Sequence, residues 1–337
     1  MIIDIPTPDE FELSATELLN TAWSQVINLL IEFEEVADFL EGDNISSEIT
    51  PDGMNYIRLP QSDEIISENT EQYWKASKQT ISIGLTLIQQ AIEFYIKGKI
   101  VNISPYMLID SVSSWPSKCN INDISFSSFK SIDAQDLIKV HNTICNSTER
   151  FDDTFINFYN EMRTLRNKLM HSVPKDINIR AEEVLEKILY VHNSFTNKSW
   201  NNDRKSFLNN TPTNSMEFFK SQRFHEPYIL DQLYKEIKLT VEKLTPSIIK
   251  KYFEYDKKRY ALLCPKCIEK LNELDFPHDS YEYHFKSFQE IDSSGVYRCI
   301  ICDFSKSISF KDEECECCEK TCIDYETNQC LISGYVL

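Results

Sequence analysis

The chain has 337 residues, 42% of them hydrophobic, which is enough for two or three domains with one large core. Its 53 acidic and 35 basic residues give a net charge of −18, which argues against a protein that coats nucleic acid by charge but not against a local basic cleft. With only six glycines and no glycine-rich phosphate-binding loop, kinase, dinucleotide-dehydrogenase and P-loop functions are excluded. No stretch approaches the length of a membrane span, so no membrane partner is expected.

Residues 1–70 are predicted to form an N-terminal helical extension. An acidic, proline-containing entry leads into an amphipathic pattern from Ser14 to Leu40, and a polar stretch follows as far as Pro60. The first residues, Met1 to Pro6, lack the charge and the apolar run of a signal peptide. We therefore expect a cytoplasmic protein with reduced cysteines.

Three further helices are predicted before residue 172. The first runs from Gln72 to Lys97 and is followed by a proline-containing stretch, and the second runs from Ala134 to Cys145. Pro174 disfavours helical geometry just before it, so the third helix should end at or just after His171. Its apolar stripe recurs at steps of four and three residues: Phe151, Phe155, Phe158, Met162, Leu165 and Leu169.

The end of this third helix carries the sequence Arg166-Asn167-Lys168-Leu169-Met170-His171. A rotation of about 100° per residue from Phe151 places Arg166 near 60°, Asn167 near 160° and His171 near 200°, away from the apolar stripe. The negative end of the helix dipole favours an imidazolium there. Because histidine titrates near neutrality, a residue in this place suits proton transfer.

Arg-Asn-x-x-x-His at the end of a helix resembles the signature of HEPN domains, which are all-α modules whose catalytic members are metal-independent endoribonucleases. The resemblance covers about residues 71–195, and only the six-residue motif is specific. It implies that Arg166 binds the scissile phosphate, that His171 acts as general acid or base and that Asn167 orients His171, with Arg163 as a further phosphate contact. The 2′-OH of RNA would be the nucleophile, giving 2′,3′-cyclic phosphate and 5′-OH ends without a catalytic cofactor.

The resemblance also implies a homodimer in which two motif helices face each other, with Ile156, Tyr159 and Met170 in contact. It implies a toxin or antiviral defence effector that cuts RNA, for which tRNA is one candidate, and that has an inhibitor, antitoxin or trigger protein as partner. Three alternatives stay open. The basic residues can simply cap the helix, the domain can be a non-catalytic adaptor that binds RNA or a protein, or the cysteine-rich tail can form a zinc-dependent enzyme.

Helices from Ile179 to His192 and from Tyr228 to Leu244 complete the predicted HEPN-like helical domain, residues 71–258. Residues 196–225, between them, are polar and show no periodic apolar pattern, which predicts a loop. Residues 250–260 mix lysines and an arginine with aromatic residues. Such a run fits either RNA contact or a solvated helix whose aromatics pack inward.

Residues 259–337 hold nine of the eleven cysteines and are predicted to form a small zinc-ribbon-like β domain. Cys264-x-x-Cys267 and Cys299-x-x-Cys302 are separated by 31 residues, a spacing typical of zinc ribbons. Four thiolates leave no open coordination position, so the zinc would be structural. The glycine that often follows each pair is replaced by Ile268 and Asp303. His278 and His284 lie between the pairs as ligands that the site does not need.

Five more cysteines follow, which exceeds what one zinc ion needs. Cys315, Cys318, Cys322 and Cys330 can form a second four-cysteine zinc site. Disulfides and an iron–sulfur cluster are the alternatives, although the reduced compartment disfavours the first and the spacing the second. The expected fold is therefore mainly α, with a HEPN-like bundle, an N-terminal helical extension and a small cysteine-rich β domain.

Overall fold

The computed structural model describes residues 1–41, 48–49, 55–56, 62–116, 123–171, 178–274, 285–291 and 295–334. Their contacts divide the chain into two compact units, Met1–Phe195 and Thr196–Leu337. The sequence predicted boundaries after residues 70 and 258 instead, and the first of these lies within one continuous helix, α2 (Asp63–Ile103). The chain is mainly helical with a small antiparallel sheet near its C-terminus, as predicted. In the ranges described, no helix is both long and apolar enough to cross a bilayer.

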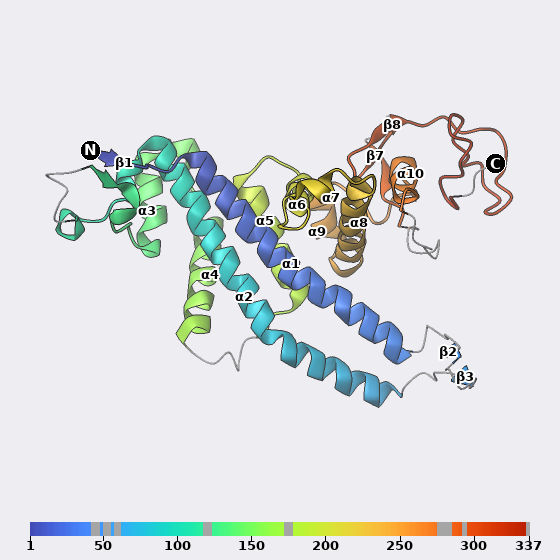
Figure 1. Ribbon diagram of the computed structural model, residues 1–337, viewed down its shortest axis with the longest axis horizontal. Coiled ribbons are helices and arrows are strands. Elements are labelled where there is room, and N and C mark those ends of the chain that lie inside the picture. The colour runs from blue at the N-terminus through green and yellow to red at the C-terminus, as the bar shows by residue number, and fades with distance from the viewer. Residues whose placement is uncertain are drawn as a thin grey trace. The chain divides into compact units, whose positions relative to one another are not determined.

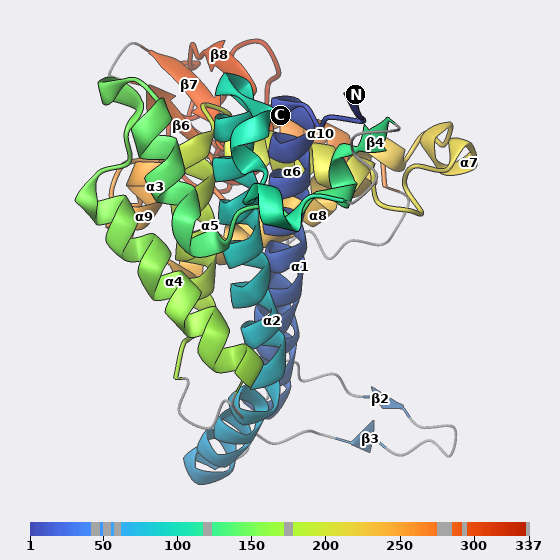
Figure 2. The same ribbon diagram turned by 90° about the vertical axis from the view of Figure 1, so that its left-hand side faces the viewer.

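The first unit is built on two long helices, α1 (Pro8–Glu41) and α2, which lie side by side (Figures 1 and 2). A reciprocal cap begins α1: the Thr7 amide donates to Glu10 Oε2 at 2.7 Å, and the Glu10 amide donates to Thr7 Oγ1 at 3.3 Å. Gly98 allows α2 to approach the start of α1 closely, because a Cβ there would lie 3.1 Å from Phe11 Cβ. Helix α1 buries its apolar stripe in this contact.

Shorter elements pack around α2, which contacts α3, α4 and α5 (Figure 2). Strands β1 and β4 pair in parallel, and β2 pairs antiparallel with β3. The elements are β1 (Ile2–Ile3), β2 (Glu48–Ile49), β3 (Asn55–Tyr56), the short 3-10 helices η1 (Pro105–Leu108), η2 (Val112–Ser114), η3 (Phe126–Ser128) and η4 (Ser147–Glu149), β4 (Ile124–Ser125), α3 (Ala134–Ile144), α4 (Asp153–His171) and α5 (Ala181–Phe195).

The second unit opens with four helices, α6 (Trp200–Asn209), α7 (Glu217–Lys220), α8 (His225–Lys243) and α9 (Pro246–Phe253). The prediction of an unstructured loop over residues 196–225 was wrong, since α6 and α7 lie within it. A buried ion pair joins α6 to α8: Arg204 donates from Nε and Nη2 to the two carboxylate oxygens of Glu236, both at 2.8 Å. Such a two-pronged contact fixes the relative orientation of the two helices.

The sheet of the second unit brings distant cysteines together. Its order is β5-β6-β7-β8, and every neighbouring pair is antiparallel. Phe288 on β6 lies opposite Leu262 on one side and Cys299 on the other, so the ends of β5 and β7 meet across one residue of β6. The elements are β5 (Ala261–Leu262), α10 (Pro265–Leu271), β6 (Phe288–Ile291), β7 (Val296–Cys299) and β8 (Ser305–Ser307).

Candidate functional site

Helix α4, which carries the Arg-Asn-x-x-x-His sequence, is held in the first unit by one face. Asp152 Oδ1 accepts a hydrogen bond from the Phe155 amide at 2.8 Å and so caps the start of the helix. Phe155, Tyr159 and Met162 are buried, and Tyr159 donates its hydroxyl to the Ala134 carbonyl at 2.5 Å. The helix is therefore fixed at its start and middle, and its last turns follow from that placement.

Arg166, Asn167 and His171 all have exposed side chains on the last turns of α4, and the described helix ends at His171. Arg166 Nη1 donates to Asn167 Oδ1 at 3.4 Å, a long hydrogen bond between neighbours. Arg163 is half-buried one turn earlier. The three motif side chains thus lie outside the core, where a substrate can reach them.

The three side chains do not all point one way. On a regular helix Asn167 and His171 are one turn apart and about 40° from each other in direction, whereas Arg166 and His171 differ by about 140°. Asn167 is therefore placed to contact His171, but one phosphate cannot easily meet Arg166 and His171 of the same helix. Of the three residues expected at a dimer contact, Tyr159 is 1% exposed, so its inclusion was wrong, while Ile156 is half-buried and Met170 is exposed.

A cavity of about 650 Å³ lies between α4 and the start of α5. Lys168 and Lys187 line it together with the carboxylates of Glu161 and Glu183, so its charge is mixed. The three motif side chains are not among the described residues that line it. The cavity therefore adds no phosphate site of its own to the motif.

The four cysteines predicted as zinc ligands do come together. The Sγ atoms of Cys264, Cys267, Cys299 and Cys302 all lie within 4.8 Å of one another, with 3.7 Å from Cys264 to Cys302 and from Cys267 to Cys299. Three of them are buried and Cys302 is half-buried. Four thiols at these separations match the corners of a tetrahedral site that could hold a metal ion.

Hydrogen bonds at Cys299 favour the thiolate form of this residue, whereas burial raises the pKa of Cys264 and hydrogen bonds with the neighbouring thiols raise that of Cys267. The Ile301 amide donates to Cys299 Sγ at 3.3 Å, and Ser287 Oγ lies at the same distance from that sulfur. Burial acts to raise the pKa of Cys299, but hydrogen bonds from the neighbouring thiols and Ser287 outweigh it and lower that pKa. A buried thiolate needs a cation beside it, so the donor set fits a structural metal ion.

Asp303 explains how the second pair forms without the expected glycine. It adopts a left-handed backbone with φ of 57°, a region that aspartate and asparagine tolerate better than most residues. Its amide donates to the Cys299 carbonyl at 3.1 Å, while the Cys299 amide donates to the Phe304 carbonyl at 2.9 Å. The departure from the common ribbon sequence therefore leaves the turn intact.

The same turn occurs at Cys315, in the second cysteine group. The Cys315 amide donates to the Lys320 carbonyl at 3.0 Å, the Glu319 amide donates to the Cys315 carbonyl at 2.8 Å, and Glu319 has a φ of 54°. Cys315-x-x-Cys318 is thus a knuckle, a turn that presents two metal-binding side chains, of the same kind as Cys299-x-x-Cys302. Sequence spacing had suggested this pair, and the backbone supports it.

A related turn starts at Cys330, but its second position holds a serine. Gly334 has a φ of 76° and donates to the Cys330 carbonyl at 2.9 Å, which places Ser333 where a second cysteine would stand. Ser333 Oγ lies 3.5 Å from Cys315 Sγ. Cys315, Cys318 and Cys330 have mutually close sulfurs, and Cys322 Sγ lies 3.4 Å from Cys318 and 3.2 Å from Cys330. This group too could hold a metal ion.

The remaining candidates from the sequence are Cys317, two histidines and the basic and aromatic run at residues 250–260. No disulfide joins the cysteines of the described ranges, and Cys317 is exposed outside both groups. His278 and His284 lie outside the described residues. In the basic and aromatic run, Phe253 and Tyr255 are buried and Lys257 Nζ caps α8 by donating to the Val241 carbonyl at 2.6 Å. These contacts favour an inward-packed helix over an RNA surface.

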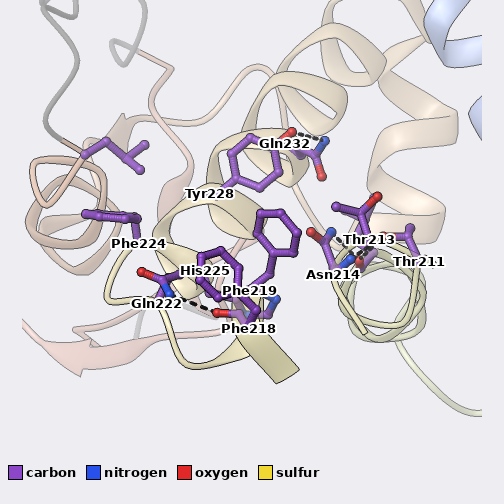
Figure 3. Close-up of a pocket in the computed structure, with 12 residues that line it drawn as sticks. Thr211, Thr213, Asn214, Phe218, Phe219, Gln222, Phe224, His225, Tyr228 and Gln232 are labelled. Carbon is purple, nitrogen blue, oxygen red and sulfur yellow. Dashed lines mark hydrogen bonds between the residues drawn. The ribbon is translucent and has the colours of Figure 1, made fainter. Parts of the chain in front are cut away.

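Sequence reasoning missed a cavity of about 640 Å³ in the second unit, lined by aromatic and amide side chains (Figure 3). Most of its lining lies in the segment expected to be a loop, and the only sequence signal was the closely spaced Phe218, Phe219 and Phe224.

Comparison with family models, curated proteins and solved structures gives no match for this chain. The likeness to HEPN domains therefore rests on the six-residue motif and its position at the end of a helix.

Proposed function

We propose that the chain is a metal-independent endoribonuclease of the HEPN type. One observation carries the proposal: Arg166, Asn167 and His171 are exposed together on the last turns of α4, a helix whose opposite face is held in the core. Exposure at the end of a fixed helix gives substrate access and a defined position at once. Simple helix capping by basic residues does not require the asparagine between them.

The chemistry follows from the residue types. His171 would take the proton of the ribose 2′-OH or give one to the leaving 5′-oxygen, and Arg166 would bind the phosphate and stabilise its developing charge. Asn167, one helical turn before His171, would hold the imidazole in its reactive orientation. The products would be a 2′,3′-cyclic phosphate and a 5′-OH, and no metal would take part in the reaction.

Two copies of the chain would complete the active site. Because Arg166 and His171 of one helix point about 140° apart, the phosphate-binding arginine is better supplied by the partner's α4 across a two-fold axis. Met170, 59% exposed, would contribute apolar contact at this interface, and Ile156 lies on a similar face about four turns earlier.

The first test is incubation of total RNA with purified protein in EDTA, with both new ends mapped by sequencing. His171→Ala should reduce cleavage by about 100-fold or more, which is the usual contribution of a general acid or base. Asn160→Ala, an exposed asparagine two turns before Asn167 on the same helix, is the control and should cut normally. Equal cleavage by wild type and His171→Ala, or intact RNA with both, would contradict the proposal, and the second result would favour the non-catalytic adaptor.

A complementation experiment tests the shared site. Arg166→Ala and His171→Ala should each be inactive, but co-expression of the two should restore up to about a quarter of wild-type activity, because half of the dimers are mixed and one of their two sites is intact. Failure to recover activity in mixed dimers, with both homodimers folded, would place Arg166 and His171 in one protomer's site.

We further propose that zinc fills both cysteine groups and is structural. Thiolate-only ligand sets with CxxC spacing favour zinc over hard cations, and four sulfurs leave no position for a reacting water. In the second group Cys322 would be the fourth ligand in place of the missing knuckle cysteine at Ser333. A role as a cytoplasmic toxin or antiviral effector, acting on RNA such as tRNA and restrained by an inhibitor or antitoxin, follows from the HEPN likeness.

A further inference from the structure

The cavity of about 640 Å³ in the second unit is formed by three neighbouring elements. The end of α6, the segment around α7 and the first half of α8 supply eleven of its lining residues, and Leu274 completes it. Figure 3 shows the rings of Tyr228, Phe219 and Phe218 between Gln232 and Gln222, with Phe224 on the far side from Thr211, Thr213 and Asn214. Its volume is in the range of pockets that bind small molecules.

Four aromatic side chains line the cavity and remain unusually accessible. Phe218 is 67% exposed, Tyr228 is 47% exposed, and Phe219 and Phe224 are also exposed. The rings of Phe218 and Phe219 meet edge to face, with centroids 5.3 Å apart. A soluble chain seldom leaves several large rings accessible in one hollow unless a ligand or partner covers them. Flat ring faces favour a flat, stacking ligand.

The remaining polar lining is neutral and can both donate and accept hydrogen bonds. Asn214, Gln222 and Gln232 are amides and His225 is an imidazole, and the described lining contains no Lys, Arg, Asp or Glu. An uncharged lining of this kind does not suit a phosphate or a carboxylate group, which would need a cation. It suits a neutral ring with donors and acceptors along its edge.

Two buried atoms of this lining have no hydrogen-bond partner within the described structure: Gln232 Oε1 and His225 Nε2. The nitrogen of the same amide does have a partner, since Gln232 Nε2 donates a hydrogen bond to the Tyr228 hydroxyl at 3.3 Å (Figure 3). Buried polar atoms are normally paired, and an unpaired one costs free energy. A ligand that carries both a donor and an acceptor would satisfy them.

We infer that this cavity binds a nucleobase, stacked on Tyr228 and the phenylalanines and hydrogen-bonded along its edge by Gln232 and His225. Unpaired bases are recognised by stacking on aromatic rings together with hydrogen bonds to their edges. Lys220 and Arg223, both exposed, lie between Phe219 and Phe224 in the chain and are available to phosphates outside the cavity. The base can belong to a free nucleotide or to single-stranded RNA. The inference goes beyond the proposed cleavage and does not depend on it.

The test is titration calorimetry on the full-length His171→Ala protein, which cannot cut RNA in the proposed mechanism. The ligands are AMP, GMP, CMP and UMP, an eight-nucleotide single-stranded RNA, and ribose 5-phosphate and decanoate as controls without a base. At least one base-containing ligand should bind with a dissociation constant of roughly 1 mM or tighter, and ribose 5-phosphate should not. Binding of mononucleotides would identify a nucleotide site, and binding of the RNA alone would identify a site for a base within a strand.

Further substitutions in the His171→Ala protein distinguish binding in the cavity from binding elsewhere on the chain. Tyr228→Ala should weaken binding by about tenfold or more through loss of stacking, and Tyr228→Phe, which keeps the ring, should bind nearly as well as the parent. Gln232→Leu keeps the shape but removes the amide and should also weaken binding. Tyr106→Ala, a tyrosine of similar exposure at 57% in the first unit, is the matched control and should change nothing. Unchanged binding in Tyr228→Ala and Gln232→Leu, or binding of decanoate but of no base, would overturn the inference.

Discussion

The Arg204–Glu236 ion pair offers a quantitative test of how the second unit is held together. Arg204 is 2% exposed and Glu236 is 6% exposed, and both bonds of the pair measure 2.8 Å. Arg204→Met removes the guanidinium but fills much of its volume, so it leaves the Glu236 carboxylate buried without its cation. Breaking a buried pair in this way costs about 3–5 kcal/mol.

The double variant Arg204→Met/Glu236→Leu should behave differently. It replaces both charges with apolar groups, and such replacements are often neutral or stabilising by about 1–4 kcal/mol. The double variant should therefore be at least as stable as the single variant and recover most of the loss. The free-energy changes of the two single substitutions should not sum to that of the double variant, because the residues are in direct contact.

The assay is native-state hydrogen exchange read by mass spectrometry on peptides from α6 and α8. A chain with two compact units does not give one defined unfolding transition, so a local readout is needed. Protection in α6 and α8 should fall in Arg204→Met and return in the double variant, while α1 peptides serve as the internal control. A single variant that costs less than about 1 kcal/mol, or a double variant less stable than the single one, would refute this reasoning.

Two further predictions concern metal and pH. Cys299→Ser should lower bound zinc by about one ion per chain, measured by elemental mass spectrometry, whereas Cys317→Ser, outside both cysteine groups, should leave the zinc content unchanged. Equal zinc in both variants would count against a metal site at Cys299. Burial lowers the pKa of His141, so the unfolded chain binds its proton more readily than the folded one. The contribution of His141 to the stability of the first unit should therefore be full above about pH 6.5 and fall as the pH drops below it. His141→Gln should flatten that dependence in the hydrogen-exchange protection of α3 peptides between pH 5 and 8, after correction for the intrinsic pH dependence of exchange. An unaltered pH profile in this variant would assign the effect to another group.

The regular helices could be predicted because their apolar residues repeat at helical spacing. The predicted segment from Ala134 to Cys145 corresponds to α3, and the one from Tyr228 to Leu244 corresponds to α8, with ends displaced by a few residues. Helix α6 was missed because its buried residues include Asn201 and Arg204, so its inner face does not look apolar in the sequence. Only the tertiary partner, Glu236 on α8, makes that arginine a core residue.

The first cysteine group could be predicted because CxxC spacing limits the backbone to a few turns. The second could be predicted only as a set of candidates, since five cysteines allow several choices. The folded backbone distinguishes them: Cys315 begins a turn like that of Cys299, and Ser333 occupies a position where a cysteine would be expected. No spacing rule identifies a missing ligand whose place is taken by a serine. The aromatic cavity could not be predicted for a related reason, because its walls come from three separate elements that only the tertiary fold brings together.

The acidity of the chain and the proposed RNA substrate are compatible if binding is local. At physiological ionic strength charges farther away than about 8 Å are largely screened, so the net charge of −18 matters less than the cations at the end of α4. Arg163, Arg166 and Lys168 are the lysine and arginine residues within the last three turns of that helix. Three phosphate contacts to a single strand predict that the logarithm of the RNA association constant falls with the logarithm of salt concentration with a slope of about −2. Filter binding with His171→Ala protein measures the slope, and Arg166→Ala in the same background should make it shallower by about 0.7. A slope much steeper than −2 that Arg166→Ala does not change would mean that RNA binds elsewhere on the chain. In that case α4 would not be the RNA-binding site.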